Sequence, residues 1–355
     1  MHLWVLHKHQ IDNISKNNQD LLALVTEIVA SQFDSKRPVA DREIGKYIAT
    51  DIIGRGAYSI VYKAIHRDLK MVVAIKMMRH HMIVDSSFLE NFRHEAQIIA
   101  SLSHSNILKV YDFEERYKTV FIVSECLEGE SLSSLLRRVG RIPQLLTIKY
   151  TLQICKGLAY AHRREIIHRD IHADNIMVLP DDRIKILDFG LACPVGTDDE
   201  QIGGKLTYQA PELLEGGRAD CKTDIYALGI TAFELLTGKT PFSADEIMAI
   251  FQGGGPRTMV DPAALVPDIH TELRRIIIKA CHHDRSQRYH TVPELINDLE
   301  ALPKPEPATA LTLEKHQQGA TVTLRYSAKQ QQEFECFMAE LRLRAKSLGI
   351  GIDES

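Results

Sequence analysis

The strongest constraint on the fold of this chain is a change of hydrophobic pattern at Gly129. Between Tyr47 and Glu125, apolar and polar residues alternate or form short apolar runs, which is the pattern of β-strands. We predict five strands in this part, in the segments IATDIIGRG, SIVYKAI, MVVAIKMM, KVYDFEE and TVFIVSE. One helix is predicted between the third and fourth strands, because the apolar residues of FLENFRHEAQIIASL recur at helical spacing.

After Gly129 the pattern is mainly helical. Helices are predicted in SLSSLLRRV, in LLTIKYTLQICKGLAYAHRR and in two shorter segments, 272–281 and 293–302. The segment TDIYALGITAFELLTG is apolar on most sides, as expected of a buried helix. The chain is therefore predicted to be an α+β protein, with a small β-rich part that holds one main helix and a larger, mostly helical part.

An extension is predicted at each end of the central domain. Residues 1–45 include LLALVTEIVASQF, which has the spacing of an amphipathic helix. Residues 303–355 begin with a proline-containing linker and continue with a strand, ATVTLRYS, and a helical stripe over 328–348. We expect both extensions to fold onto the domain or to serve self-association, because their apolar faces need covering. The central domain and its two parts span residues 46–302, 46–126 and 127–302.

Composition gives no reason to expect nucleic acid as a partner, because charged residues make up 25% of the chain and the net charge is −4. No apolar run approaches the roughly 18–20 residues that cross a bilayer. The start, MHLWVLHKHQ, lacks the long apolar run and cleavage site of a secretory signal. We therefore predict no membrane span and a cytoplasmic location.

Two glycines, Gly54 and Gly56, stand one residue apart between the first two predicted strands. Without a Cβ, they let the backbone approach phosphate oxygens closely. This pattern predicts a nucleotide-binding loop, although a purely structural hairpin explains the two glycines equally well. The residues of this loop are Ile53, Gly54, Arg55, Gly56, Ala57, Tyr58 and Ser59.

Lys76 lies within the apolar strand segment MVVAIKMM, where a lysine must find an anion or lose its charge. Glu95 follows 19 residues later, on the inner face of the predicted helix, and can pair with it. The alternative is a lysine on an edge strand that extends its ammonium group to solvent.

Two later segments carry most of the chemistry, IIHRDIHADNIMV at 166–178 and IKILDFGL at 184–191. In this order, and with AIK before them, they resemble the protein kinase family. The resemblance covers about residues 46–302. It implies the two-lobed protein kinase fold and transfer of phosphate from ATP to a protein hydroxyl. The compact core looks like that of a bacterial serine/threonine kinase.

The resemblance implies a role for each motif residue. Asp170 is the catalytic base that accepts the proton of the substrate hydroxyl. Asn175 and Asp188 hold Mg²⁺ on the triphosphate of ATP. Lys76 binds the α- and β-phosphates, and Glu95 holds Lys76 in place.

Other parts of the family pattern fall into register. Ala210-Pro211-Glu212 closes the activation segment, and Arg288 matches the arginine that pairs with Glu212. Asp224 matches the aspartate that braces the backbone of the catalytic loop. The family's adenine site would consist here of Val61, Ala74, Met177, the backbone of Glu125 and Leu127, and Ser124 at the gatekeeper position.

The pattern is broken at two positions that meet beside the γ-phosphate in the family fold. His172 stands where the HRDxK motif has lysine, and Lys205 stands where threonine usually follows the glycine, here Gly204. We interpret this as an exchange in which Lys205 supplies the missing cation, so Lys205 is a catalytic candidate. A weakened site is the alternative. Tyrosine kinases carry arginine where this chain has His172 or Asp174, which favours a serine/threonine kinase.

Two other functions compete with an active protein kinase. A nucleotide-binding scaffold without activity is disfavoured because all the motif residues are present. A kinase-like enzyme that acts on a small molecule is disfavoured because the APE segment and Arg288 are both found. The acidic run at 198–200 either replaces an activating phosphate or simply solvates a loop.

Overall fold

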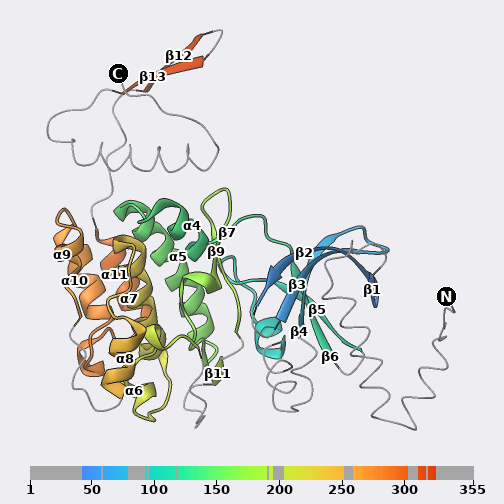
Figure 1. The fold of residues 1–355 in the computed structure, drawn as a ribbon, viewed down its shortest axis with the longest axis horizontal. Helices are drawn as coiled ribbons and strands as arrows, with labels where there is room; N and C mark the ends of the chain where they lie inside the picture. The colour runs from blue at the N-terminus through green and yellow to red at the C-terminus, as the bar shows by residue number, and fades with distance from the viewer. Residues whose placement is uncertain are drawn as a thin grey trace. The chain divides into compact units, whose positions relative to one another are not determined.

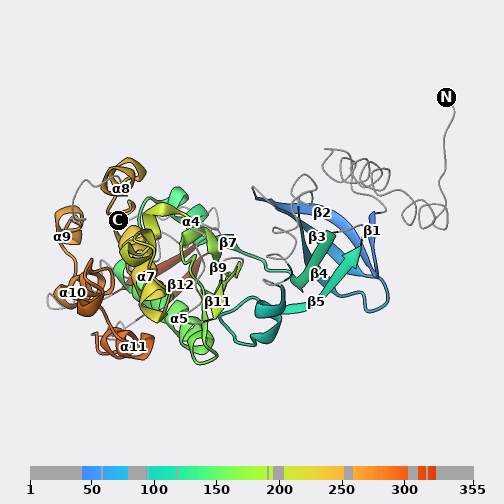
Figure 2. The same cartoon turned by 90° about the horizontal axis from the view of Figure 1, so that it is seen from below.

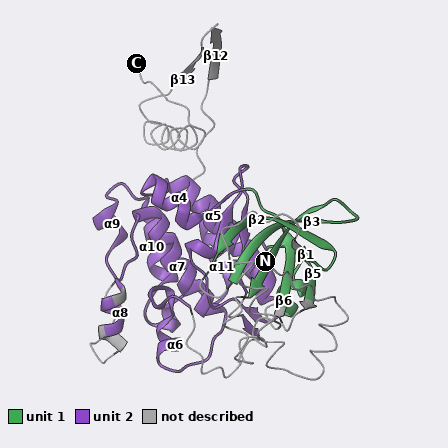
Figure 3. Ribbon diagram, turned by 45° about the vertical axis from the view of Figure 1, so that its right-hand side comes forward, with its two compact units in different colours: residues 1–104, 108–128 green, residues 105–107, 129–355 purple. Residues whose placement is uncertain are grey.

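In the computed structural model the chain forms two compact units (Figure 3). Unit 1 comprises Met1–His104 and Leu108–Glu128, and unit 2 comprises Ser105–Ile107 and Gly129–Ser355. The helices predicted at 21–33 and 328–348 lie outside the described residues. Of the helix predicted after the third strand, the described residues 93 and 96–101 are helical. The structure describes residues 42–56, 59–78, 93, 96–116, 119–189, 192–194, 204–251, 259–302, 311–316 and 319–324.

Unit 1 is built on a six-stranded sheet with the order β1-β2-β3-β4-β6-β5, in which every pair of neighbours is antiparallel (Figures 1 and 2). The predicted β-rich part is therefore confirmed. The strands are β1 (Arg42–Ile44), β2 (Tyr47–Arg55), β3 (Ser59–His66), β4 (Val72–Met78), β5 (Val110–Arg116) and β6 (Thr119–Glu125).

The predicted number of five strands is wrong, because β1 adds a sixth. It precedes the predicted boundary at residue 46 and pairs with β2, with Ile44 opposite Tyr47. Three residues are too few to show a period of two in the sequence. The turn is marked by Gly45, whose φ of +60° is a conformation that glycine adopts without steric cost.

The two faces of the sheet have different roles. One face carries a hydrophobic core that includes Tyr62 and Ile75, both fully buried. Directly opposed residues of antiparallel strands share a face. The pair Val61–Lys76 therefore lies on the other face, together with Ala74 two residues before Lys76.

Unit 2 is mostly helical, as predicted, and α7 lies in the middle of its helices (Figures 1 and 2). This helix packs against α5, α9 and α10, and 13 of its 17 residues are buried. The helices are α4 (Leu132–Val139), α5 (Gln144–His162), α6 (Pro211–Leu214), α7 (Cys221–Thr237), α8 (Ala244–Phe251), α9 (Pro262–Leu265), α10 (Thr271–Ala280) and α11 (Val292–Glu300).

Local sequence signals set both ends of α7. At its start, Asp220 and Thr223 form a capping box that satisfies backbone N–H groups of the first turn. At its end, Gly238 adopts a left-handed conformation with a φ of +79°. In its middle, Gly229 permits close packing, because a Cβ there would stand 2.8 Å from the backbone nitrogen of Cys281.

Short strands complete unit 2, and several elements escaped prediction. The unpredicted elements are the short helices α6, α8 and α9, the short strands β7 to β11 and the strand β12, whereas β13 overlaps the predicted strand ATVTLRYS. Within the described part of the chain, no helix is long and apolar enough to cross a membrane. The strands are β7 (Glu130–Ser131), β8 (Ile166–Ile167), β9 (Ile176–Val178), β10 (Ile184–Ile186), β11 (Cys193–Pro194), β12 (Leu311–His316) and β13 (Gly319–Leu324).

The predicted ion pair between Glu212 and Arg288 is confirmed. Two guanidinium nitrogens of Arg288 each donate to a carboxylate oxygen of Glu212 at 2.8 Å. The Arg288 side chain is fully buried, and its Nε donates to the carbonyl of His282 at 2.7 Å. This pair ties α6 to the segment before α11.

Replacing Glu212 by glutamine should lower the free energy of unfolding by about 3 kcal/mol, because it leaves a buried guanidinium without its anion. Chemical denaturation followed by circular dichroism measures the loss. Glu272→Gln is the matched control, since Glu272 pairs with Arg275 with about half of each side chain exposed, and it should cost less than about 1 kcal/mol. Equal losses in the two variants would contradict the buried role of Glu212.

Candidate active site

The predicted motif residues of unit 2 gather in the loop between β8 and β9. This loop, residues 168–175, contains one turn of 3₁₀-helix, η2 (Ala173–Asn175). Residue 187 at the end of β10 is joined to it, since the N–H of Leu187 donates to the carbonyl of Asn175 at 2.8 Å. The two motif segments therefore lie side by side.

Asp224 on α7 braces this loop, as predicted. It is fully buried, and its two carboxylate oxygens accept the backbone N–H groups of His168 at 2.9 Å and Arg169 at 2.8 Å. The Nε2 of His162 lies 2.7 Å from the same carboxylate. Burial acts to raise the pKa of Asp224, but the hydrogen bonds and nearby histidines outweigh it and hold the pKa below the ordinary value.

Two residues of the site have backbone angles that are uncommon outside glycine. The φ of Arg169 is +66° and that of Asp188 is +46°. Such conformations cost energy and persist where the surroundings hold them. At Arg169, the bond from its N–H to Asp224 is one such restraint.

Asp170 and Asn175 are joined directly by hydrogen bonds. The amide nitrogen of Asn175 donates to the Asp170 carboxylate at 2.8 Å and to its backbone carbonyl at 2.9 Å. The N–H of Asp170 also donates to Nδ1 of His168 at 3.2 Å. These bonds fix both the carboxylate and the backbone of Asp170.

The electrostatic surroundings keep Asp170 ionised. Burial acts to raise its pKa, but the hydrogen bond and charge of His172 outweigh this and lower the pKa. The negative charge of Asp188 acts in the opposite direction, which indicates that the two carboxylates are close enough to interact. An ionised Asp170 can accept a hydrogen bond from a hydroxyl group at neutral pH.

The residues present fit a magnesium ion. The amide nitrogen of Asn175 faces Asp170 and His172, so its Oδ1 is the atom that can coordinate a cation. Asp188 adds a carboxylate. One or two carboxylates and neutral oxygens, completed by phosphate and water, are the ligands that Mg²⁺ takes in phosphoryl-transfer sites.

In unit 1, Lys76 lies on an inner strand. β4 pairs with β3 on one side and with β6 on the other, so Lys76 stands between Val61 and Ile122. The alternative of a lysine on an edge strand is therefore wrong. Glu95 lies outside the described residues, so its predicted pairing with Lys76 stays a prediction.

The glycine-rich loop joins β2 to β3. The N–H of Gly56 donates to the carbonyl of Ser59 at 2.8 Å and closes the turn, while Ala57 and Tyr58 lie outside the described residues. A Cβ on Gly54 would approach the described atoms no closer than 3.4 Å, and the same holds for Gly56. Since 3.4 Å is an ordinary contact, the described part of the hairpin does not itself require glycine at either position.

The other predicted adenine-site residues are divided between the units. In unit 1, Ala74 and Ser124 are directly opposed and both buried. The backbone N–H of Glu125 donates to the carbonyl of Lys109 at 2.9 Å. Met177 lies on β9 of unit 2 and is half-buried.

Residues 47–298 of the sequence match the protein kinase domain, which is well over half of the chain. The chain belongs to the protein kinase family. It is 34% identical over 258 residues to a probable serine/threonine-protein kinase of Clostridium acetobutylicum, covering 72% of this chain and 39% of that protein.

Other relatives of this kinase domain have similar names. The serine/threonine-protein kinase PrkC of Bacillus subtilis is 34% identical over 265 residues, covering 74% of this chain and 41% of PrkC. PknL of Mycobacterium tuberculosis is 31% identical over 261 residues, covering 72% of this chain and 65% of PknL. The alignments thus span about two fifths to two thirds of the relatives' own lengths.

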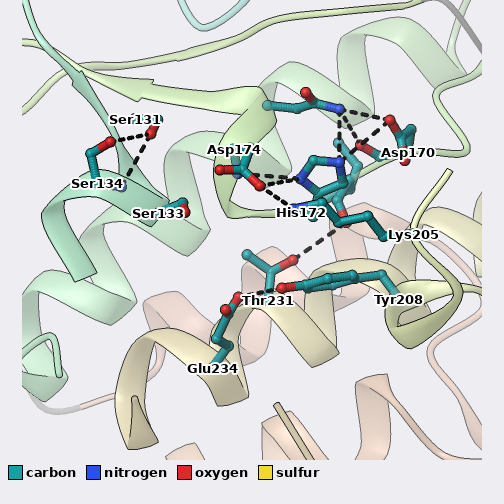
Figure 4. A network of polar contacts seen from close by, with 12 residues as sticks. Ser131, Ser133, Ser134, Asp170, His172, Asp174, Lys205, Tyr208, Thr231 and Glu234 are labelled. Atoms are coloured by element: carbon teal, nitrogen blue, oxygen red, sulfur yellow. Dashed lines mark hydrogen bonds and ion pairs between the residues drawn. The ribbon is translucent and has the colours of Figure 1, made fainter. Parts of the chain in front are cut away.

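The two positions that depart from the kinase pattern lie in one polar network (Figure 4). Lys205 forms an ion pair with the carboxylate of Asp174. The ring of His172 is buried, with Nε2 3.4 Å from the Asp170 carboxylate and Nδ1 3.7 Å from that of Asp174. The predicted proximity of positions 172 and 205 is therefore found in this kinase domain, with Asp174 between them.

Sequence reasoning missed three residues of this network. Asp174 pairs with Lys205, and the hydroxyl of Tyr208 donates to Glu234 of α7 at 2.7 Å. Burial raises the pKa of both Glu234 and Tyr208. The signal that could have identified Asp174 is Lys205, which stands where the family pattern has threonine. A lysine at this position is expected to have a carboxylate nearby.

Replacing Asp224 by asparagine should destabilise the protein by about 3 kcal/mol at pH 7, since a buried anion with several donors is removed. The pKa of Asp224 is lower in the folded protein than in the unfolded chain. The stability that its charge contributes is therefore fully present above the ordinary aspartate pKa, and it is lost as the pH falls through the lowered, folded-state pKa. The difference between the two proteins should therefore shrink below about pH 4. Denaturation at pH 7 and between pH 4.5 and 3 measures it, and a constant difference would contradict the charge argument.

Proposed function

We propose that this chain is an ATP-dependent serine/threonine protein kinase, which transfers the γ-phosphate of ATP to a hydroxyl group of a protein substrate. The observation that carries the proposal is the fixed, ionised Asp170, bound by Asn175 in a loop whose backbone is anchored to buried Asp224. Membership of the protein kinase family supports the same reaction, as do the names of the relatives.

In this proposal, Asp170 accepts a hydrogen bond from the substrate hydroxyl and then its proton. Because its pKa is lowered, Asp170 acts mainly by orienting the hydroxyl for in-line attack, and it takes the proton as the bond to phosphorus forms. Asn175 and Asp188 would hold Mg²⁺, which would supply positive charge beside the phosphate oxygens.

We assign ATP binding to residues of both units. The described part of the hairpin has room for a Cβ at Gly54 and at Gly56, so its own packing does not explain the two glycines. This supports a role for them in the close approach of a ligand. The inner-strand position of Lys76 supports its pairing with phosphate and with Glu95. The nucleotide-binding residues in this proposal are Ile53, Gly54, Arg55, Gly56, Ala57, Tyr58, Ser59, Val61, Ala74, Lys76, Glu125, Leu127 and Met177.

Lys205 supplies a catalytic cation in this proposal. The ion pair with Asp174 holds its ammonium group at the loop that carries Asp170. A lysine there can replace the charge that histidine does not permanently carry.

The two extensions, residues 1–45 and 303–355, serve association in this proposal, either with the kinase domain or with a second copy of the chain. Their apolar helical stripes, at 21–33 and 328–348 in the sequence, support this role. The cytoplasmic location predicted from the sequence stays a prediction.

Replacing Asp170 by asparagine should leave ATP binding nearly intact and lower turnover by roughly 10²–10⁴-fold, because the proton acceptor is lost. Asp188→Asn should instead abolish the magnesium-dependent part of ATP binding. Calorimetric titration with ATP, with and without Mg²⁺, and phosphate transfer to a library of serine and threonine peptides measure the two effects. Full activity of Asp170→Asn would refute the mechanism, and an unaltered chain that binds ATP without transferring phosphate would be a scaffold.

The exchange of charges at positions 172 and 205 makes a separate prediction. Lys205→Thr should lower turnover about tenfold, which corresponds to roughly 1.4 kcal/mol of transition-state stabilisation. Adding His172→Lys restores the usual family pair and should recover much of this loss, so the two changes should not be additive. Turnover of the two single variants and the double variant gives the coupling. Additive changes would show that the two departures are unrelated.

A further inference from the structure

Asp174 stands at the junction of two segments that are far apart in the sequence (Figure 4). It lies in η2, directly before Asn175, and its carboxylate pairs with Lys205, which is 31 residues away at the end of the activation segment. Burial acts to raise the pKa of Asp174, but the hydrogen bonds of Lys205 and Ser133 outweigh it and lower the pKa.

His172 links Asp174 to Asp170. The backbone N–H of Asp174 donates to Nδ1 of His172 at 3.2 Å, and Nε2 lies 3.2 Å from the amide nitrogen of Asn175. The same Nε2 lies 3.4 Å from the Asp170 carboxylate. The ring of Tyr208 packs on the imidazole with centroids 5.5 Å apart, and only 5% of His172 is exposed. The imidazole is therefore held in place by its neighbours. Its position in turn limits where the Asp170 carboxylate can lie.

The segment that carries Lys205 is anchored independently. Lys205 caps the short helix η3 (Leu206–Tyr208), and the Tyr208 hydroxyl is bound to Glu234 of α7. This anchor places the backbone of Lys205. The lysine side chain itself is long, flexible and half-exposed, so its ammonium group is placed by the anion that it meets.

We propose that Asp174 is a positioning residue for phosphoryl transfer, which holds Lys205 and, through His172, the Asp170 carboxylate in their working arrangement. This inference rests on the proposed function. The HRDxK pattern and the asparagine that follows it assign no role to position 174. This chain has histidine at position 172, where the family pattern has lysine, and it has a lysine at position 205 instead. The Asp174 carboxylate holds the ammonium group of Lys205 beside the loop.

The competing interpretation is an ordinary surface ion pair. The side chains of Lys205 and Asp174 are 50% and 39% exposed, and such pairs contribute little to stability. Loss of the pair should therefore leave the fold intact under both interpretations. Turnover distinguishes them, because only a positioning role makes it depend on the Asp174 carboxylate.

The test compares Asp174→Asn with Asp174→Glu and with a matched control, Asp181→Asn, in the full-length chain. Asp181 is an exposed carboxylate paired with Arg183 outside the network. We expect Asp174→Asn to lower kcat for transfer from Mg-ATP to the peptide library about tenfold, with KM for ATP changed less than about twofold. Asp174→Glu should recover most of kcat, and Asp181→Asn should have no effect.

Two further measurements separate positioning from a structural role. The melting temperature of Asp174→Asn should stay within about 3 °C of that of Asp181→Asn. Hydrogen exchange at residues 204–208 should stay at the rate of the Asp181→Asn control, because the bond from Tyr208 to Glu234 anchors this backbone without the ion pair, and faster exchange would indicate a structural role. In a chain that already carries Lys205→Met, adding Asp174→Asn should lower kcat by less than it does alone, because the ion pair is already lost.

An Asp174→Asn variant with the kcat of the Asp181→Asn control would overturn the inference. A parallel loss of kcat and melting temperature that Asp174→Glu does not restore would also overturn it, in favour of a structural role. Phosphate transfer by the unaltered chain, and its loss in Asp170→Asn, test the proposed function separately. If both hold while Asp174→Asn stays fully active, only the role of Asp174 falls.

Discussion

The Asp224 carboxylate lies fully buried on α7 and binds the N–H groups of His168 and Arg169, with the ring of His162 beside it. A fully buried carboxylate without hydrogen-bond donors would strongly destabilise the fold. The Asp224 carboxylate therefore requires these donors, and the donors require the carboxylate as their acceptor. The positive φ of Arg169 is held within this arrangement. Because α7 is itself surrounded by other helices, the conformation of the 168–175 loop follows from the packing of unit 2, and the position of Asp170 follows from the loop.

The sequence predicts well the elements whose pattern is long enough to show a period. β2 to β6 and α7 have seven or more residues, and each was recognisable from alternation or from a continuous apolar run. β1 has three residues and α9 has four, so neither shows a period. β12 has six residues but escapes prediction, since LTLEKH follows the proline-containing linker and no second strand is expected there. Its pairing with β13 is a property of two segments together.

The site shows the same division between local and long-range information. Asp170, Asn175 and Asp188 were predicted because they stand in short motifs with fixed spacing, and the bracing by Asp224 followed from the motif on α7. The pairing of Lys205 with Asp174 could not be read from either segment. It joins residues 31 positions apart, and it depends on how the end of the activation segment is anchored through Tyr208 to α7. The local sequence around either residue does not show how close the two side chains lie in the folded protein.

The two ion pairs that hold the end of the activation segment differ in a way that suits different roles. Arg288 is fully buried and meets Glu212 through two bonds, so the pair cannot open without leaving a charge in the protein interior. Lys205 and Asp174 are both partly exposed, and solvent can replace either partner at little cost. The first pair therefore fixes the backbone, whereas the second sets only where the Lys205 ammonium group lies, and its loss leaves the surroundings folded.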